Sequence, residues 1–279
     1  MMPGLPAEIL CVIFLMLDTQ TLLTIPQVCT FWRGICYGLA DVRLDFEWLT
    51  QRVAHLCVQR SVCARSRRVN PTTFGSVLAR FPGTTRVSIY NILPLGLVTP
   101  MGREGGVLLT DAGVLVLADK CRGLKRATFN ICYKLTDAAV LGLAAKCRGL
   151  THASFRGCEH LTDAAVLGLA AKCRGLMHAN FDFCSKLTDA AVLALAAKCS
   201  GLTRVSFGHC PLLTDAAVIA LADNCRGLTH IDFGFCGKLT DAAVIALADN
   251  CRGLTDIDFR FCRKLTDAAV LKLTSSLGL

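Results

Sequence analysis

The stretch Leu135-Thr-Asp-Ala-Ala-Val140 decides the fold, because the same six residues return every 26 residues along the chain. Copies begin at Leu161, Leu187, Leu213, Leu239 and Leu265, and a near copy with glycine at its fifth position begins at Leu109. Residues 109–264 therefore hold six full units, and residues 265–279 hold just over half of a seventh. A fixed period of this length indicates stacked supersecondary units, which usually present an extended binding face.

The first half of each unit predicts a short helix. In the unit 135–160, Thr136 and Asp137 supply a capping oxygen and a negative charge at the helix N-terminus. Apolar residues then recur at helical spacing and form one stripe, made of Val140, Leu143, Ala144 and Cys147. Gly149 follows, at the place where a left-handed residue commonly closes a helix.

The second half of each unit predicts a short strand. Ala153 and Phe155 alternate with polar residues, so one face of the strand is buried. Neither the helix nor the strand can bury its apolar face within one unit, so neighbouring units must supply the core. The inward column that we expect to form an aromatic spine is Phe129, Phe155, Phe181, Phe207, Phe233 and Phe259.

A cysteine follows each of these strands, in the column Cys132, Cys158, Cys184, Cys210, Cys236 and Cys262. The pattern resembles the cysteine-containing subtype of leucine-rich repeat, in which cysteine replaces the usual asparagine. The resemblance implies an α/β fold, a right-handed leucine-rich-repeat solenoid with parallel strands on the concave side and helices on the convex side.

The composition argues against a membrane or secreted protein. The chain is 53% apolar, which alanine-rich packed helices explain. Its longest apolar run, Ile9 to Leu17, is too short to span a bilayer, and no Lys or Arg precedes it as in a secretion signal. We therefore expect a soluble protein of the cytoplasm, the nucleus or both, without a membrane partner.

The 17 cysteines are expected to be reduced core residues. Most fall in two inward columns, one on the helix and one after the strand, and a free cysteine behaves as a small apolar residue. Their spacing alternates between 11 and 15 residues and lacks the close pairs of zinc sites, and their odd total leaves one thiol without a disulfide partner. We expect no metal and no cofactor.

The net charge of +9 does not identify a partner by itself. The tightest basic cluster is Arg60, Arg65, Arg67 and Arg68, and no aromatic residues are interleaved with it. The cluster fits a solvated connector better than a nucleic-acid contact or a nuclear address, so a nucleic-acid partner is not expected.

Residues 5–36 break the repeat and form three short apolar patches of helical character, too few to make an independent core. Leu5-Pro6, Glu8-Ile9-Leu10 and Trp32-Arg33 resemble the F-box in order and spacing. The resemblance implies docking onto the adaptor subunit of an SCF ubiquitin ligase, which bridges it to the cullin. The adaptor contacts implied are Leu5, Pro6, Ile9, Leu10, Ile13, Phe14, Leu17, Leu22, Val28, Cys29 and Trp32.

Two alternatives stay open for this module, which we place at residues 1–40. It could be a three-helix F-box, or a helical cap that packs only on the solenoid. Pro26 falls where the family continues a helix, so either a helix ends early there or the module is weakened.

The remaining boundaries place a connector at 41–73, a degenerate first repeat with an insertion at 74–108 and the solenoid at 109–279. In the degenerate repeat, Val87 and Ile89 match Ala127 and Phe129, and some 14 extra residues around 92–105 predict an exposed loop. The polar stretch 274–276 suits a terminal cap, and an incomplete chain is the alternative.

The outward strand positions vary while the rest of each unit barely changes, so they are the candidate target-binding face. Basic residues come early, acidic residues come late, and three phenylalanines add apolar anchors, the mix of a protein-binding patch. The alternative for these aromatic rings is that they only cover the post-strand turns. The predicted face is Arg126, His152, Arg156, His178, Asp182, Phe183, Arg204, His209, His230, Asp232, Phe235, Asp256, Asp258, Arg260 and Phe261.

These features predict a non-catalytic substrate receptor of an SCF-type ubiquitin ligase, with the F-box on the adaptor and a target protein on the concave face. No phosphate loop, nucleophile elbow or zinc signature is present. A leucine-rich-repeat scaffold with a vestigial F-box is the main alternative, and small-molecule sensing, as in the F-box hormone receptors of plants, is a third.

Overall fold

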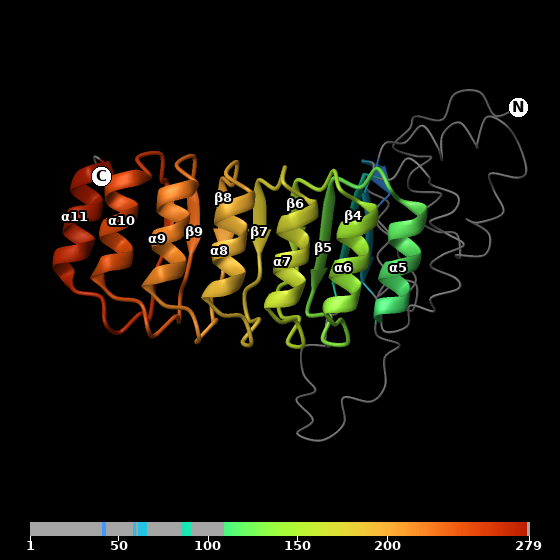
Figure 1. Cartoon of the computed structure of the whole chain (residues 1–279), viewed down its shortest axis with the longest axis horizontal. Helices are drawn as coiled ribbons and strands as arrows, with labels where there is room; N and C mark the ends of the chain where they lie inside the picture. Colours follow the sequence, from blue (N-terminus) through green and yellow to red (C-terminus); the bar gives the residue numbers. More distant parts are fainter. Residues whose placement is uncertain (1–40, 43–57, 60, 66–84, 91–108, 278–279) are drawn as a thin grey trace, which may run out of the picture.

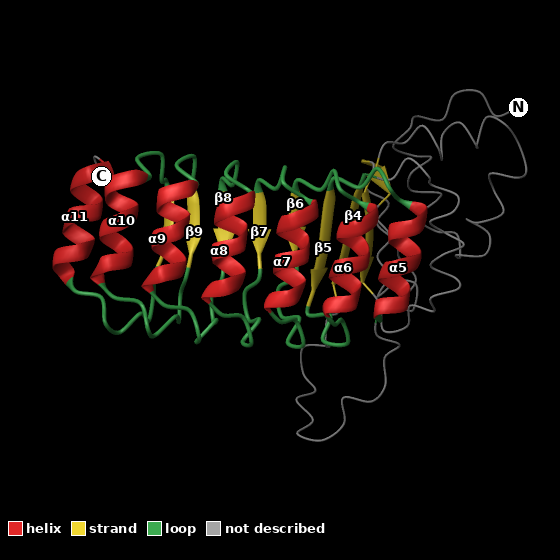
Figure 2. Cartoon of the chain, in the orientation of Figure 1, coloured by secondary structure: helices red, strands yellow, loops and turns green. Residues whose placement is uncertain are grey.

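The computed structural model describes residues 41–42, 58–59, 61–65, 85–90 and 109–277. Figure 1 shows the helices side by side in chain order, forming one layer in front of the strands, and Figure 2 separates the two layers by colour. The helices are α5 (Asp111–Lys120), α6 (Asp137–Lys146), α7 (Asp163–Lys172), α8 (Asp189–Lys198), α9 (Asp215–Asn224), α10 (Asp241–Asn250) and α11 (Asp267–Leu277).

The strands of the second layer form one parallel sheet in chain order, from β3 to β10. They are β3 (Ser61–Arg65), β4 (Arg86–Tyr90), β5 (Arg126–Asn130), β6 (His152–Ser154), β7 (His178–Asn180), β8 (Arg204–Ser206), β9 (His230–Asp232) and β10 (Asp256–Asp258). A separate antiparallel pair joins β1 (Asp41–Val42) to β2 (Val58–Gln59). The alternation of helix and parallel strand confirms the predicted leucine-rich-repeat solenoid.

The start and the buried stripe of α6 to α10 agree with the sequence. In α5 the Thr110 side chain makes no cap bond, and in α11 Val270 of the stripe is 49% exposed. In α6, the Thr136 hydroxyl accepts a hydrogen bond from the Ala138 N–H at 3.3 Å, as expected of an N-cap. Val140, Leu143 and Ala144 are fully buried, and so is Cys147.

The end of each helix differs from the prediction, because Gly149 is not left-handed. The Cys147 N–H still bonds to the Leu143 carbonyl, and the Leu150 N–H then bonds to the Cys147 carbonyl at 3.2 Å. This tight turn closes without a positive φ angle. The left-handed residue of the repeat lies instead in the turn after the strand, where Gly157 has φ of 71°.

The ladder extends further toward the N-terminus than the regular repeat. Val87 pairs with Ala127 and Ile89 with Phe129, so the register of the degenerate repeat is as predicted. The sequence analysis did not predict β3, which pairs in parallel with β4 and lies within the range assigned to a connector. The insertion 92–105 and the F-box residues lie outside the described residues.

The core is a spine of stacked phenylalanines. Five of the six predicted rings, Phe129 to Phe233, are fully buried, with neighbouring centroids 5.5–5.8 Å apart. Phe259 is half-buried, because no further strand follows β10 in the described chain. The predicted strand orientation is therefore confirmed, and the variable side chains face away from the core.

The cysteines fill the gaps of this core as thiols. The twelve cysteines of residues 109–277 are all buried and form no disulfide. The Cys158 thiol donates to the Phe129 carbonyl at 3.2 Å, and the Cys147 thiol to the Cys121 carbonyl at 3.4 Å. Burial raises the pKa of Cys132 to about 12, which keeps that sulfur protonated.

Adjacent units are locked together at the helix N-termini. Oδ1 of Asp137 accepts the N–H of Thr162 in the next unit at 2.8 Å, and Oδ2 accepts the Thr162 hydroxyl at 2.6 Å. The same pair of bonds joins every unit to the next, from Asp111 to Thr266. None of the helices in the described ranges has the length and apolar character needed to cross a membrane.

Candidate functional site

The outward side chains of the sheet stand in straight rows, because the strands pair without a shift in register. The first row runs Arg86, Arg126, His152, His178, Arg204, His230 and Asp256. The second row, two residues further along each strand, runs Ser88, Thr128, Ser154, Asn180, Ser206, Asp232 and Asp258. Between β5 and β10 these rows line a groove of about 570 Å³, which we call the sheet-face groove.

The groove brings together part of the predicted target-binding face. The predicted residues that line it are His152, His178, Arg204, His230, Asp232, Asp256 and Asp258. Arg126 lies beside His152 in the same row. The sequence analysis missed Arg86, although the match of Val87 with Ala127 would have placed it in the column of Arg126. The other predicted residues lie in the turns after the strands.

Two histidines lie against each other in the middle of the first row. The ring centroids of His152 and His178 are 4.1 Å apart. Burial, together with the cations around it, lowers the pKa of His152 to about 4, and burial followed by Arg204 lowers the pKa of His178. Both rings are therefore neutral at pH 7.

A threonine fixes which nitrogen of His152 carries the proton. The Thr151 hydroxyl donates to the Lys125 carbonyl at 3.0 Å, and its oxygen lies 2.8 Å from Nδ1 of His152. Since the hydroxyl has only one proton, Nδ1 must be the donor in that second contact. Nε2 is then the basic atom of the ring, free to take up a proton.

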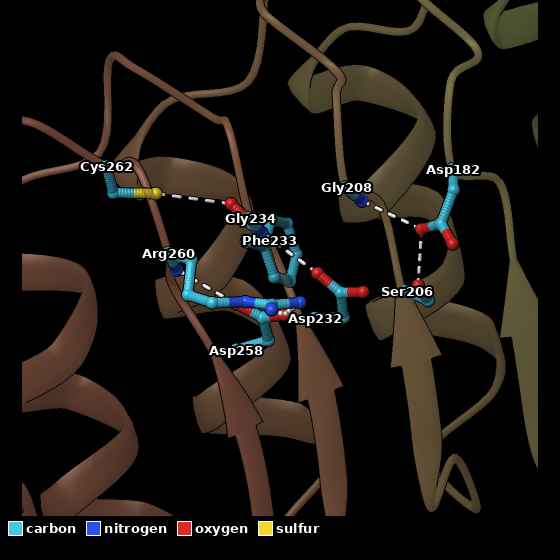
Figure 3. Close-up of polar contacts among 9 residues, drawn as sticks. All are labelled: Asp182, Ser206, Gly208, Asp232, Phe233, Gly234, Asp258, Arg260 and Cys262. Atoms are coloured by element: carbon cyan, nitrogen blue, oxygen red, sulfur yellow. Dashed lines mark hydrogen bonds and ion pairs between the residues drawn. The ribbon is translucent and has the colours of Figure 1, made fainter.

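The carboxylates at the acidic end of the groove differ in their hydrogen-bond partners, and Figure 3 shows those of Asp232 and Asp258. Arg260 binds Asp258 through Nη2 at 2.6 Å and Nε at 2.9 Å, which lowers the pKa of Asp258. Asp232 accepts the Gly234 N–H at 2.9 Å, and burial raises its pKa. Asp256 stays open, with its side chain 72% exposed. The acidic residues that looked equivalent in sequence therefore differ in the charge they offer a ligand.

Asp182 does not belong to the exposed face on which it was predicted. It is only 6% exposed, and its Oδ1 accepts the Gly208 N–H at 2.9 Å and the Ser206 hydroxyl (Figure 3). Asn180 donates to the other carboxylate oxygen at 3.1 Å. The carboxylate thus ties the turn after β7 to β8, a role that depends on a neighbouring unit.

The turns after the strands carry a stacked aromatic rim, made of Phe183, His209, Phe235 and Phe261. Successive ring centroids are 4.0, 3.9 and 4.2 Å apart, and the Arg156 guanidinium lies 5.2 Å from the centroid of Phe183. The phenylalanines remain 39%, 42% and 63% exposed along the rim. The predicted apolar anchors are thus brought together as one edge of the sheet face.

The rim residues have a strained backbone. Their φ angles lie between 59° and 63°, a region that favours glycine. Such strain costs about 1–3 kcal/mol per residue, and it often marks functional positions. Gly157 occupies the equivalent turn one unit earlier without this cost. A large exposed ring at a position where glycine fits better favours a binding role for the rim.

Within the described ranges, no three His, Cys, Asp or Glu side chains are grouped so that they could hold a metal ion. The predicted adaptor contacts, from Leu5 to Trp32, lie outside the described residues. The groove and the rim are therefore the surface on which the structural argument for function rests.

Comparison with known proteins finds one family match and a similar fold among solved structures. The F-box-like family model matches residues 2–40. The fold is similar to that of a chain in the crystal structure of the Rad7 and Elc1 complex in yeast, with a TM-score of 0.56 and 20% identity. This chain joins an F-box-like segment to a leucine-rich-repeat solenoid.

The similarity covers 77% of this chain and 66% of the solved one, so the chain spans a little under two thirds of that relative. At this identity, the likeness shows the fold of the solenoid. Among curated proteins, none matches the chain. The cysteine-containing repeat subtype stays a prediction from the sequence.

Proposed function

We propose that this chain is the substrate-recognition subunit of an SCF-type ubiquitin ligase. Its F-box-like segment would bind the adaptor subunit, and through it the cullin, while the sheet-face groove and the aromatic rim bind a target protein. The observation that carries the proposal is the joining of an F-box-like match at residues 2–40 to a solenoid with an exposed, variable face. The Rad7 and Elc1 complex supports it as a protein of similar fold found together with a partner.

The proposed mechanism is proximity. The chain contributes no chemistry, and it raises the concentration of the target near a ubiquitin-charged enzyme bound to the same complex. Degradation of the target would follow in the cytoplasm or the nucleus, where we place the protein. The groove suits a protein ligand because it combines a polar floor, isolated charges and an apolar edge.

The test is a pull-down of purified SCF adaptor, and in parallel of an Elc1-type adaptor, with the full chain. We expect the wild-type chain to retain the SCF adaptor and a Leu5→Asp, Pro6→Ala variant to lose it. Arg174→Glu, on an exposed turn of the solenoid, is the matched control and should bind as the wild type does. If the wild type binds the SCF adaptor no better than the variant does, the SCF proposal is rejected, and retention of the Elc1-type adaptor alone would assign the chain to a different ligase.

Pro26 favours a second candidate, a leucine-rich-repeat scaffold with a vestigial F-box. A proline in the middle of a helix costs about 3 kcal/mol and could abolish adaptor docking. In that case the chain without residues 1–40 would bind its target and perform its cellular role as well as the full chain.

A further inference from the structure

The open charges of the sheet-face groove have a fixed order along the solenoid. The first row begins with Arg86 and Arg126, passes the neutral histidine pair, and reaches a further cation at Arg204. Its only carboxylate is Asp256, at the last described strand. A ligand lying across the strands therefore meets positive potential first and negative potential last.

The two guanidinium groups that flank the histidine pair are those of Arg126 and Arg204. Among the described residues, no carboxylate forms an ion pair with Arg126, Arg204 or either histidine of the pair. Arg126 and Arg204 are exposed, and the two half-buried imidazoles lie between them. An anionic group entering here would therefore be flanked by two guanidinium groups, which bind carboxylates well.

At the other end, one carboxylate is available to a ligand. Arg260 neutralises Asp258, and Asp232 is half-buried against the Gly234 N–H. Asp256 is exposed, and its only described ion-pair contact is His230, whose Nε2 lies 3.9 Å away. A cationic side chain of a ligand can therefore approach Asp256 without breaking a short ion pair, since the His230 contact is long.

We propose that the sheet-face groove selects an extended, dipolar segment of the target, with a carboxylate over His152 and His178 and a Lys or Arg against Asp256. The midpoint of the histidine pair and Asp256 are three and a half strand spacings apart, or about 17 Å. An extended chain rises about 3.3 Å per residue, so the two charges would be about five residues apart. This inference rests on the proposed function, since it names the chemistry of the target.

The histidine pair should also make the affinity for this segment depend on pH. Burial opposes protonation of both imidazoles, and the neighbouring cations Arg86, Arg126 and Arg204 add to this effect, with the titratable His230 one strand beyond Arg204. A bound carboxylate adds a negative charge and therefore raises the histidine pKa values. Proton uptake then accompanies binding, so affinity increases as the pH falls.

The experiment measures binding of fluorescein-labelled hexapeptides to the full chain by fluorescence polarisation. The probe is Glu-Thr-Val-Thr-Val-Lys with blocked ends, and its controls replace Glu by Gln, Lys by Gln, or place Glu and Lys next to each other. We expect the probe to bind about tenfold more tightly than each control. Between about pH 7.5 and about pH 5.5, its affinity should increase about threefold or more, while that of the Gln-for-Glu control stays constant.

Two protein variants assign each peptide charge to its site. In Arg204→Glu the preference for Glu over Gln should disappear, and in Asp256→Lys the preference for Lys over Gln should disappear. The matched controls are Arg174→Glu and Asp223→Lys, which change exposed residues outside the groove and should keep both preferences. Because all four positions are exposed, the variants are expected to fold.

Equal binding of all peptides, or preferences that survive in the groove variants, would overturn the inference. So would the absence of binding by every peptide at about 1 mM. Adaptor binding does not depend on the groove, so an intact adaptor pull-down beside these results would leave the proposed function standing and reject only the dipolar ligand.

Discussion

At the scale of single residues, two columns of phenylalanine use the same side chain in opposite ways. Phe207 is fully buried between Phe181 and Phe233, with centroids 5.5 and 5.8 Å away. Phe261 stacks on Phe235 at 4.2 Å but is 63% exposed. The inner column supplies apolar burial to every unit, whereas the outer column leaves ring edges in contact with solvent.

Phe207→Ala should therefore lower the free energy of unfolding by about 3–5 kcal/mol, the usual cost of truncating a buried aromatic residue. Phe261→Ala removes the same atoms from a mainly exposed site and should cost less than about 1 kcal/mol. Equilibrium urea unfolding followed by circular dichroism measures both. A loss below about 1 kcal/mol for Phe207→Ala would contradict the inward orientation of the spine.

The left-handed rim offers a second test at this scale. Phe235→Ala keeps the strained φ of 63°, whereas Phe235→Gly relieves it, so the glycine variant should be more stable by about 1 kcal/mol. Gly157→Ala imposes the same strain on an unstrained turn and should destabilise by a similar amount. Urea unfolding compares the three. If alanine at position 235 is as stable as glycine, the ring is not held there against a backbone penalty.

At the scale of elements, the sequence could predict every regular helix and strand, because each unit repeats the signals of the last. The prediction that Gly149 closes the helix in a left-handed conformation was wrong, because the tight turn after Cys147 needs no left-handed residue. β3 could not be predicted, because the stretch 61–65 carries neither the Phe column nor the repeated hexapeptide and is paired by contact with β4. A repeated local pattern predicts an element, whereas a strand without that pattern forms through pairing with its neighbour in the sheet.

The bonds between helix N-termini are the element-scale interaction most open to test. Asp189→Ala removes two hydrogen bonds to Thr214, of 2.8 and 2.6 Å, and a negative charge at the N-terminus of α8. We expect a loss of about 1–2 kcal/mol in the free energy of unfolding. Asp267→Ala is the control, because among the described residues no threonine of another unit donates to its carboxylate, and should cost less than about 0.5 kcal/mol. Equal losses at the two positions would show that the bond between units adds nothing.

At the scale of the whole molecule, the sequence predicted the outward rows and their basic-to-acidic order, but not which of the charged side chains remain open. Outward positions follow from the strand period, so the row from Arg126 to Asp256 could be predicted. Whether a carboxylate is open depends on a neighbour in space. Ser206 and Gly208 bury Asp182, and Arg260 neutralises Asp258. Only the assembled sheet therefore shows which of these carboxylates remain available to a ligand.

A solenoid held by contacts between neighbours should open from its ends, and the buried thiols can report this. Cys262 follows β10, which has a paired strand on one side only among the described residues, whereas Cys184 follows β7, which is paired on both sides. Both thiols are buried, so N-ethylmaleimide reaches either of them only when the surrounding units open. In sub-denaturing urea, N-ethylmaleimide should modify Cys262 and Cys251 first and Cys184 only at the rate of global unfolding, as followed by peptide mass spectrometry. Terminal modification that rises with urea well before Cys184 reacts would locate the weak end next to Asp256, whereas simultaneous modification of all sites would mean that the units open as one.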